Sequence, residues 1–293
     1  MGDLIKKYDG GHFTEGLFYD TIKPMENSLE KLFYTLITGA TGGIGRAFAE
    51  TLAAKGQNLF LTGRSADKLN ALKEELSSNY PSLRVIVFAC DLTDERSRDE
   101  MYKTIDAQGV VFDRLCNVAG ADIQKAFEKY TEKKIVFQCR VNLEATLSVT
   151  RFVLSRRADA LEIVTISSMS GVYPMPYFAL YSATKSALVS FFSSLRSELK
   201  GSGVKITTVL PGGVYTRPDI VKDIEGQGLW GKMSAKTPEY IAQKSLQAVR
   251  RNRKQLIPGF WNKFLATVPK IVPQNWRMRF IARRWRNLEK DAF

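Results

Sequence analysis

Short apolar runs alternate with longer segments of helical periodicity from Phe33 to Pro258. Residues 33–38 are rich in aromatic and β-branched side chains and end at a glycine, as buried strands do. Because such strands alternate with helical patterns at 44–55 and 67–78, the sequence predicts βαβ units with right-handed crossovers. The expected fold is a doubly wound α/β protein: a parallel sheet of six to seven strands with helices on both faces. The other six runs span residues 58–62, 83–89, 114–117, 162–167, 204–210 and 255–257.

Charge divides the chain into three parts. The 43 Lys and Arg against 30 Asp and Glu give a net charge of +13, of which residues 241–293 carry 13 − 2 = +11. A near-neutral body with a basic end is not the charge pattern of a nucleic-acid-binding domain, so nucleic acid is not an expected partner. We expect an N-terminal extension over residues 1–31, one domain over 32–258, and a basic, aromatic, helical tail over 259–293.

Composition excludes several kinds of chemistry. His12 is the one histidine, so Ser-His-Asp and Cys-His catalysis and histidine-rich metal sites lack their central residue. Cys90, Cys116 and Cys139 have neither CxxC nor metal-ligand spacing, and they are expected to be buried thiols in a reducing, cytoplasmic compartment. No signal peptide is expected after Lys6 and Lys7, and no apolar run approaches the roughly 18 residues of a spanning helix.

A glycine-rich loop, Thr38-Gly-Ala-Thr-Gly-Gly-Ile-Gly45, joins the first run to the first helix. Glycines there let backbone amides at a helix N-terminus approach a pyrophosphate, so the loop predicts a Rossmann-type dinucleotide site. The alternative is a tight turn without a ligand, although four glycines are more than a turn requires. The spacing fits two branches of nucleotide-binding enzymes, through Gly39, Gly43 and Gly45 or through Gly39, Gly42 and Gly45.

The end of the second run indicates which dinucleotide is preferred. An acid at this point binds the ribose hydroxyl of NAD, whereas an arginine accommodates the 2′-phosphate of NADP. Thr62-Gly63-Arg64 carries the arginine, and the nearest acid, Asp67, lies beyond the run. The sequence therefore favours NADP(H) over NAD(H). The alternative is that Arg64 is a solvated loop residue.

A tyrosine and a lysine begin the helical pattern that follows residues 162–167. Tyr181 and Lys185 are four residues apart and share one helix face. A phenol titrates near pH 10, and a nearby lysine cation, together with an oxidised nicotinamide, would lower that pKa. Ser168 lies 13 residues before Tyr181 and can hydrogen-bond a substrate carbonyl beside the phenol.

Together with Asp91, Asn142, Asn117-Val-Ala-Gly120 and Pro211-Gly212, these motifs resemble the short-chain dehydrogenase/reductase superfamily. The resemblance covers about residues 33–258 and is to its short single-domain branch, similar to 3-oxoacyl reductases and hydroxysteroid dehydrogenases. Val118 stands where the family usually has a second asparagine. The spacing from Ser168 to Tyr181, the Pro-Gly motif and the modest length disfavour the longer sugar-nucleotide epimerase branch.

The resemblance implies a role for each motif. Tyr181 is the general acid or base, Lys185 lowers its pKa and binds the nicotinamide ribose, Ser168 orients the carbonyl, and Asn142 positions a relay water. Hydride passes directly between nicotinamide and substrate, so no metal is expected. The cofactor-binding residues implied are Gly39, Thr41, Gly43, Ile44 and Gly45 at the pyrophosphate, Arg64, Asp91 and Leu92 toward the adenosine, Asn117, Ala119 and Gly120 near its ribose, Tyr181 and Lys185, and Pro211, Gly212, Val214 and Thr216 at the carboxamide.

The expected substrate is a lipophilic ketone or secondary alcohol of steroid or long-chain acyl type. No lysine or arginine is evident among the candidate pocket residues, although a small polar ketone or sugar stays an alternative, as does a non-catalytic dinucleotide-binding regulator. A substrate lid is expected over residues 217–236, and a homodimer or homotetramer by analogy. The candidate pocket residues are Val172, Tyr173, Met175, Tyr177, Phe178, Tyr215 and Trp230.

The tail carries aromatic and basic residues at helical spacing. Trp276, Phe280, Ile281, Trp285 and Leu288 would form one stripe, with Arg277, Arg279, Arg283, Arg284 and Arg286 around it. Such a helix can pack on the protein body or a sister subunit and roof the active site, or it can lie on a membrane surface. Contact with nucleic acid or another acidic partner is the third interpretation.

Overall fold

The computed structural model describes residues 32–216, 221, 233–267, 273–286 and 290–291. These residues belong to one compact unit. The N-terminal extension expected over 1–31, most of the expected lid, Trp230 and Leu288 lie outside the described residues.

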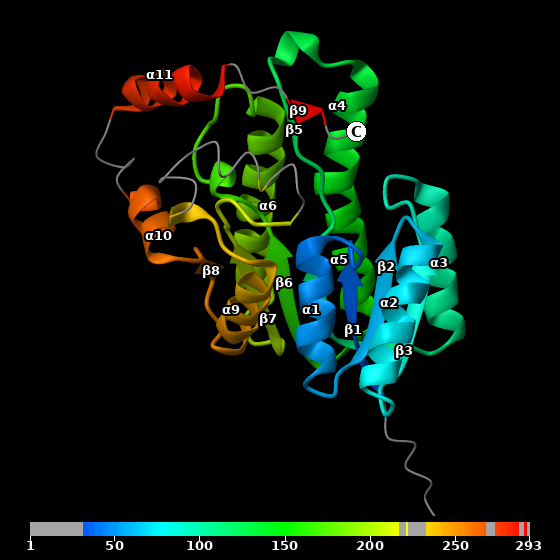
Figure 1. Cartoon of the computed structure of the whole chain (residues 1–293). Coiled ribbons are helices and arrows are strands. Elements are labelled where there is room, and N and C mark those ends of the chain that lie inside the picture. The colour runs from blue at the N-terminus through cyan, green and yellow to red at the C-terminus, as the bar shows by residue number, and fades with distance from the viewer. Residues whose placement is uncertain (1–31, 217–220, 222–232, 268–272, 287–289, 292–293) are drawn as a thin grey trace, which may run out of the picture. The chain divides into compact units, whose positions relative to one another are not determined.

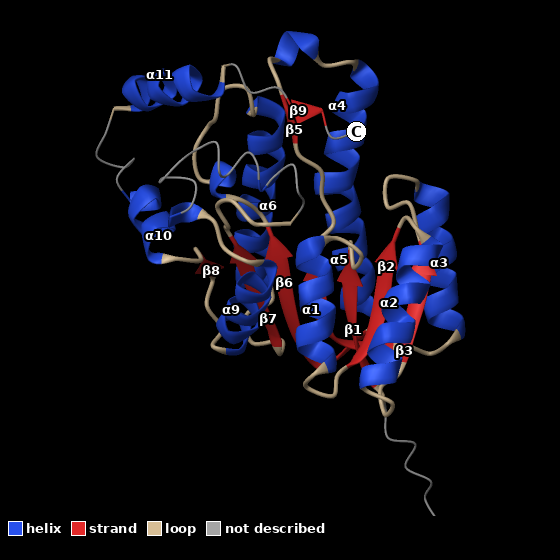
Figure 2. Ribbon diagram, viewed as in Figure 1, coloured by secondary structure: helices blue, strands red, loops and turns tan. Residues whose placement is uncertain are grey.

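The described residues form the seven-stranded parallel sheet that the sequence predicts, in the order β3-β2-β1-β4-β6-β7-β8 (Figure 2). The order reverses between β1 and β4, which makes their carboxyl ends the topological switch point at which such sheets bind ligands. The strands are β1 (Phe33–Thr38), β2 (Asn58–Gly63), β3 (Val85–Ala89), β4 (Val111–Asn117), β6 (Arg157–Ile166), β7 (Val204–Val209) and β8 (Gln255–Leu256).

Two strands begin earlier than predicted. β4 includes the charged Asp113, and its pairing with β1 and β6 shifts register around Phe112 and Arg114. The first residues of β6, Arg157-Ala-Asp-Ala160, are charged or small and mostly exposed. Charged residues interrupt the apolar pattern in both strands, Asp113 in β4 and Asp159 in β6, so the predicted runs covered only the later part of each strand.

Helices cover both faces of the sheet and enclose two hydrophobic cores. Leu36, Phe60, Phe112 and Phe192 are fully buried in one core, and Ile37, Leu59 and Leu61 point to the other, as alternate residues of a strand must. One face carries α1 (Gly43–Ala53), α2 (Ala66–Asn79) and α9 (Pro238–Arg250), and the other α3 (Glu95–Ala107), α5 (Ala145–Ser155) and α6 (Ala179–Glu198).

The tail forms two helices rather than one, α10 (Phe260–Thr267) and α11 (Gln274–Trp285). Beyond them, β9 (Lys290–Asp291) pairs antiparallel with β5 (Ile123–Gln124) in a small second sheet that was not predicted. Figure 1 shows α11 and this pair of strands beyond the carboxyl ends of the main sheet. No helix within the described residues combines the length and apolarity needed to cross a membrane.

The three cysteines are free thiols. Cys90 and Cys116 are buried as expected, and burial raises the pKa of both. Cys139, at the end of α4 (Glu132–Cys139), is half-buried, contrary to the expectation that all three are core residues.

Replacing Phe112 with alanine should lower the free energy of unfolding by about 3–5 kcal/mol, because it leaves a cavity in a fully buried layer. The Phe112 ring meets the Phe60 ring edge-on at 6.3 Å, so that contact is lost as well. Chemical denaturation measures the change. Phe127→Ala is the control, since Phe127 is 55% exposed and its truncation should cost little. Equal losses in the two variants would contradict this account of the core.

Candidate active site

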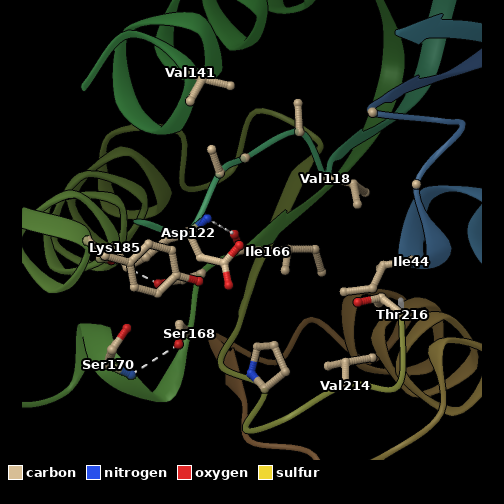
Figure 3. Close-up of a pocket in the computed structure, with 18 of the residues that line it drawn as sticks. Ile44, Val118, Asp122, Val141, Ile166, Ser168, Ser170, Lys185, Val214 and Thr216 are labelled. Carbon is tan, nitrogen blue, oxygen red and sulfur yellow. Dashed lines mark hydrogen bonds between the residues drawn. The ribbon is translucent and has the colours of Figure 1, made fainter. Parts of the chain in front are cut away.

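A cavity of about 990 Å³ opens at the carboxyl ends of β1, β4, β6 and β7, at the switch point of the sheet. This is the upper end of the usual volume for a ligand pocket. Figure 3 shows Asp122 and Lys185 toward one side of the cavity, with Ile44, Val214 and Thr216 on the opposite side. The cavity-lining residues among those expected at the cofactor are Gly39, Thr41, Gly43, Ile44, Gly45, Arg64, Asp91, Leu92, Ala119, Gly120, Tyr181, Lys185, Pro211, Gly212, Val214 and Thr216.

The glycine loop lets two strand ends approach closely. A Cβ added to Gly39, whose φ is +65°, would lie 2.9 Å from the Ala119 Cα. From the end of β1, the Thr38 hydroxyl oxygen accepts hydrogen bonds from the backbone N–H groups of Val118 (3.0 Å) and Ala119 (3.1 Å). The glycine thus permits the contact between the loops after β1 and β4, and the threonine stabilises it.

The N-terminus of α1 faces the same cavity with its amides uncapped. Gly42 is its N-cap and supplies no side-chain hydrogen bond, and the first turn holds no acid. By contrast, α2, α3, α4 and α9 are each capped by a side chain, from Ser65, Asp94, Thr131 and Thr237. Unpaired N–H groups and the positive end of the helix dipole suit a pyrophosphate, so the loop fits a dinucleotide.

Arg64 and Asp91, which the sequence predicts at the adenosine, lie at the ends of β2 and β3. Both side chains are exposed and line the cavity, Arg64 just beyond β2 and Asp91 after β3. The Asp91 carboxylate accepts hydrogen bonds from the Thr93 backbone N–H (2.9 Å) and hydroxyl (2.8 Å), which hold it in place. The cavity therefore has a cation after β2 and a fixed carboxylate after β3.

Ser168, Tyr181 and Lys185 gather on the other side of the cavity, where α6 docks on the end of β6. Ser167 donates its hydroxyl hydrogen to the Lys185 carbonyl oxygen at 2.8 Å. The Lys185 ammonium donates to the Ile166 carbonyl oxygen at 3.1 Å. A Cβ on Gly171 would lie 2.8 Å from the same Lys185 carbonyl oxygen, so only glycine leaves room for this approach.

The pKa of the Tyr181 phenol is raised above its usual value. Burial is the main cause, because it penalises the phenolate, and the Asp122 carboxylate adds to it. A hydrogen bond with Ser168 acts the other way. Burial also lowers the pKa of Lys185 to about 8, and the Asp122 charge opposes that shift. The expected lowering depended on the Lys185 cation together with an oxidised nicotinamide, so it stays a prediction. The Lys185 ammonium lies 5.7 Å from the centre of the phenol ring.

Asp122 is a charged site residue that the sequence analysis did not identify. It lines the cavity two residues after Gly120 and acts on both Tyr181 and Lys185. Its position directly after the Asn-Val-Ala-Gly-Ala segment is the sequence feature that could have identified it as a site residue. An isolated aspartate in a loop is, however, usually a solvated turn residue.

The side chains of Asn142 and Asn117 are buried behind the cavity wall and do not line the cavity. Asn142 is fully buried in a π-helical turn (Arg140–Glu144). Its side-chain oxygen accepts a hydrogen bond from the Ala121 backbone N–H (2.8 Å), and its side-chain nitrogen donates to the Ala121 carbonyl oxygen (2.9 Å) and the Thr184 hydroxyl (3.1 Å). Asn117 is likewise buried, and its amide donates to the Thr150 hydroxyl at 3.0 Å. Its side chain therefore braces α5 against the end of β4, and a role of Asn117 at the cofactor stays a prediction. Asn142 ties the Asp122 loop to α6.

Apolar side chains form the substrate end of the cavity. Of the candidates, Tyr173, Met175 and Phe178 line it, whereas Val172, Tyr177 and Tyr215 do not. Tyr177 has a φ of +64°, and its hydroxyl oxygen accepts a hydrogen bond from Arg286 Nε at 3.3 Å. The lining residues that the sequence did not single out are Asp122, Gln124, Phe137, Val141 and Asn262, along with neighbours of the predicted motifs. Ser234 belongs to the expected lid, and Ile281 and Trp285 belong to the tail stripe for which a roof over the active site is one interpretation.

Part of the tail closes this end of the cavity. Ile281 and Trp285 of α11 line it, and the Trp285 ring lies 5.5 Å from the Phe178 ring. From α10, Asn262 packs against Gly212, where a Cβ would lie 2.9 Å from its amide oxygen. Residues beyond the predicted domain boundary at 258 are thus structural parts of the site.

Comparison with known proteins identifies the family. The sequence pattern of the short chain dehydrogenase family matches residues 34–225. Very-long-chain 3-oxoacyl-CoA reductase of Bos taurus is 32% identical over 248 residues, which cover 80% of this chain and 75% of that enzyme. Sulfoacetaldehyde reductase of Chromohalobacter salexigens is 31% identical over 244 residues, 78% of this chain and 95% of that enzyme.

The fold is shared with solved structures as well. A 7β-hydroxysteroid dehydrogenase superimposes with a TM-score of 0.76 at 24% identity, covering 86% of this chain and 98% of that one. The glycine loop, the strand order and the Ser168, Tyr181 and Lys185 cluster lie within the part of the chain that these matches cover. The chain therefore belongs to the short-chain dehydrogenase family of oxidoreductases, which act on CH–OH groups.

Proposed function

We propose that this oxidoreductase reduces a ketone on a lipophilic substrate to a secondary alcohol with NADPH, and catalyses the reverse reaction with NADP⁺. The observation that carries the proposal is the arrangement within one cavity. Uncapped amides of α1 line one part of it, and Ser168, Tyr181 and Lys185 line another. The wall next to Tyr181 is largely apolar.

The side chains divide the acid–base work. Ser168 accepts a hydrogen bond from the Ser170 backbone N–H at 3.1 Å, which leaves its O–H to donate to Tyr181 or to a substrate carbonyl. Tyr181 gives its phenolic proton to the carbonyl oxygen, and Lys185, protonated below its pKa of about 8, stabilises the phenolate that forms. The bound nicotinamide would supply the hydride. Because burial raises the pKa of Tyr181, the phenol holds its proton at neutral pH and is available as the donor for carbonyl reduction.

Arg64 supports the choice of NADPH. Members of the family bind NAD(P)(H), which leaves the preference to this chain's own residues. Arg64 is an exposed cation at the end of β2, the position that meets the 2′ substituent of the adenosine ribose. A guanidinium there forms charge-assisted hydrogen bonds with the 2′-phosphate of NADP, whereas the neutral 2′-hydroxyl of NAD would gain no ion pair.

Apolar lining and the Asp122 charge support a lipophilic, uncharged substrate. Met175, Phe178, Ile281 and Trp285 line the cavity, and the Phe178 ring lies 5.3 Å from the Tyr181 ring and 5.5 Å from the Trp285 ring. The bovine relative is named for a very-long-chain 3-oxoacyl-CoA, whose acyl end is lipophilic although its coenzyme A end is anionic, and the Chromohalobacter relative is named for sulfoacetaldehyde, a small anion. The Asp122 carboxylate would repel an anion bound beside Tyr181. The polar lining residues Gln124, Ser234 and Asn262 favour the alternative function, which is reduction of a small polar carbonyl compound.

Replacing Tyr181 with phenylalanine should reduce ketone reduction by about 100- to 10,000-fold, because the proton donor is lost while the ring is kept. NADPH oxidation would be followed with long-chain 3-oxoacyl and steroid ketones, and with L-sorbose and sulfoacetaldehyde as small polar competitors. Tyr102→Phe, on α3, is the control and should leave the rate unchanged. Unchanged turnover in Tyr181→Phe would refute the mechanism, and turnover of only the small polar compounds would refute the substrate class.

Replacing Asp122 with asparagine should move the high-pH limb of the reduction rate to lower pH. Asp122 raises the pKa of both Tyr181 and Lys185, so its neutralisation lets both groups lose their protons at lower pH. Reduction requires a protonated phenol and a lysine cation, so both effects act in the same direction. Rates measured from pH 6 to 10 test this, with Asp99→Asn on α3 as the control. A limb that moves to higher pH would contradict the assignment.

Replacing Arg64 with alanine should raise the KM for NADPH by about 10- to 100-fold, the range for losing a charge-assisted hydrogen bond. The KM for NADH should stay nearly constant, because its ribose carries no phosphate. Arg151→Ala on α5 serves as the control. An unchanged ratio of the two KM values would show that Arg64 does not read the phosphate.

A further inference from the structure

The residues of α11 divide between two faces. At 100° per residue, Ile281 and Trp285 lie on one face and line the catalytic cavity. Trp276 and Phe280 lie roughly on the opposite face, where they are 70% and 71% exposed. Arg279 and Arg283, on that same outer stripe, are exposed as well. The aromatic residues of this helix therefore do not all pack on the body, as a simple roof over the site would require.

The shorter helix α10 is divided in the same way. Its inner residue Asn262 donates hydrogen bonds to the carbonyl oxygens of Ser234 (2.9 Å) and Pro258 (2.7 Å). Its outer residues Phe260, Trp261 and Phe264 are 78%, 40% and 49% exposed. Their rings contact one another edge to face at 6.2 and 5.9 Å. The inner hydrogen bonds thus hold an aromatic cluster in an outward orientation.

Positive charge accompanies both clusters. Between Phe260 and Arg286 the sequence has no acidic residue and the basic residues Lys263, Lys270, Arg277, Arg279, Arg283, Arg284 and Arg286. A second, small cavity of about 190 Å³ lies between α9, the loop after it and α10. Four of its lining residues are basic and none is acidic: Lys244, Arg251, Arg253 and Lys263. Lys263 belongs both to this cavity and to the outer side of α10.

We propose that the outer faces of α10 and α11 dock on the surface of an anionic lipid bilayer. Aromatic rings flanked by arginine and lysine are the side chains that bind at the headgroup level. Two exposed aromatic clusters without acidic residues match a negative surface in charge and a hydrocarbon boundary in polarity. The cationic cavity beside α10 suits the phosphate of a headgroup.

Docking would bring the catalytic cavity to the bilayer. Asn262 of α10 and Ile281 and Trp285 of α11 line that cavity, so the two helices that bind the surface also form its wall. A lipophilic substrate dissolved in the membrane would then reach Tyr181 without crossing water. This consequence rests on the proposed function, whereas binding to vesicles does not depend on any substrate.

The experiment is co-sedimentation of the full chain with vesicles of phosphatidylcholine alone or mixed with phosphatidylglycerol. Binding should require the anionic lipid, and Trp276→Ser/Phe280→Ser should reduce it strongly. Leu32→Ser/Phe33→Ser is the matched control, because these residues are 39% and 42% exposed at the amino end of β1. Equal sedimentation of the two double variants would overturn the proposal.

The charge contribution has its own pair of variants. Arg279→Glu/Arg283→Glu should lower the partition coefficient on anionic vesicles by about 30-fold or more, at roughly fivefold for each cation removed. Lys73→Glu/Lys103→Glu, on α2 and α3, changes the net charge equally and should have a much smaller effect. Equal losses would show that only the overall charge matters and would overturn the docking face.

Two further measurements exclude other partners. Light scattering should give the same molar mass for the wild type and Trp276→Ser/Phe280→Ser, and a smaller mass for the variant would make the face a subunit interface instead. Duplex DNA that binds as tightly as anionic vesicles would equally overturn the proposal. Reduction of a water-soluble ketone should be unaffected by these variants, so a failure of docking is distinguishable from a failure of the proposed chemistry.

Discussion

The site depends on the docking of α6 against the carboxyl end of β6. The Lys185 carbonyl oxygen receives the Ser167 hydroxyl hydrogen, and the Lys185 ammonium donates to Ile166, so the lysine is held at both ends. Gly171 leaves space for this approach. Because Tyr181 lies one turn before Lys185, and Ser168 directly follows Ser167, these contacts bring the three side chains to the same cavity.

Burial and the Asp122 charge act differently on Tyr181 and Lys185. Burial penalises the Tyr181 phenolate and the Lys185 ammonium, and the Asp122 carboxylate disfavours the first and favours the second. Asp122 therefore acts on both groups, since its charge favours the protonated phenol and the lysine cation.

The helix α11 in the C-terminal segment has one face toward the cavity and another face that is exposed. An amphipathic pattern specifies that a helix has an apolar stripe, but not what covers it. In α11 the aromatic residues are spread widely enough to give two stripes, with Trp285 in the cavity and Trp276 exposed. The interpretations of the tail as a roof and as a surface-binding helix are therefore compatible, because they concern different residues of the same helix.

The sequence by itself determined the sheet, the glycine loop and the Ser168, Tyr181 and Lys185 set, because these depend on periodicity and short spacing along the chain. It also determined Arg64 and Asp91 as loop residues at strand ends, since parallel strands bring their carboxyl ends to one edge. Only the tertiary structure placed Asp122 beside Tyr181, Asn117 behind the cavity wall, and Trp285 in the wall of the cavity. Those positions depend on which distant segments meet, and burial then sets the sign of the Tyr181 pKa shift, which spacing alone cannot reveal.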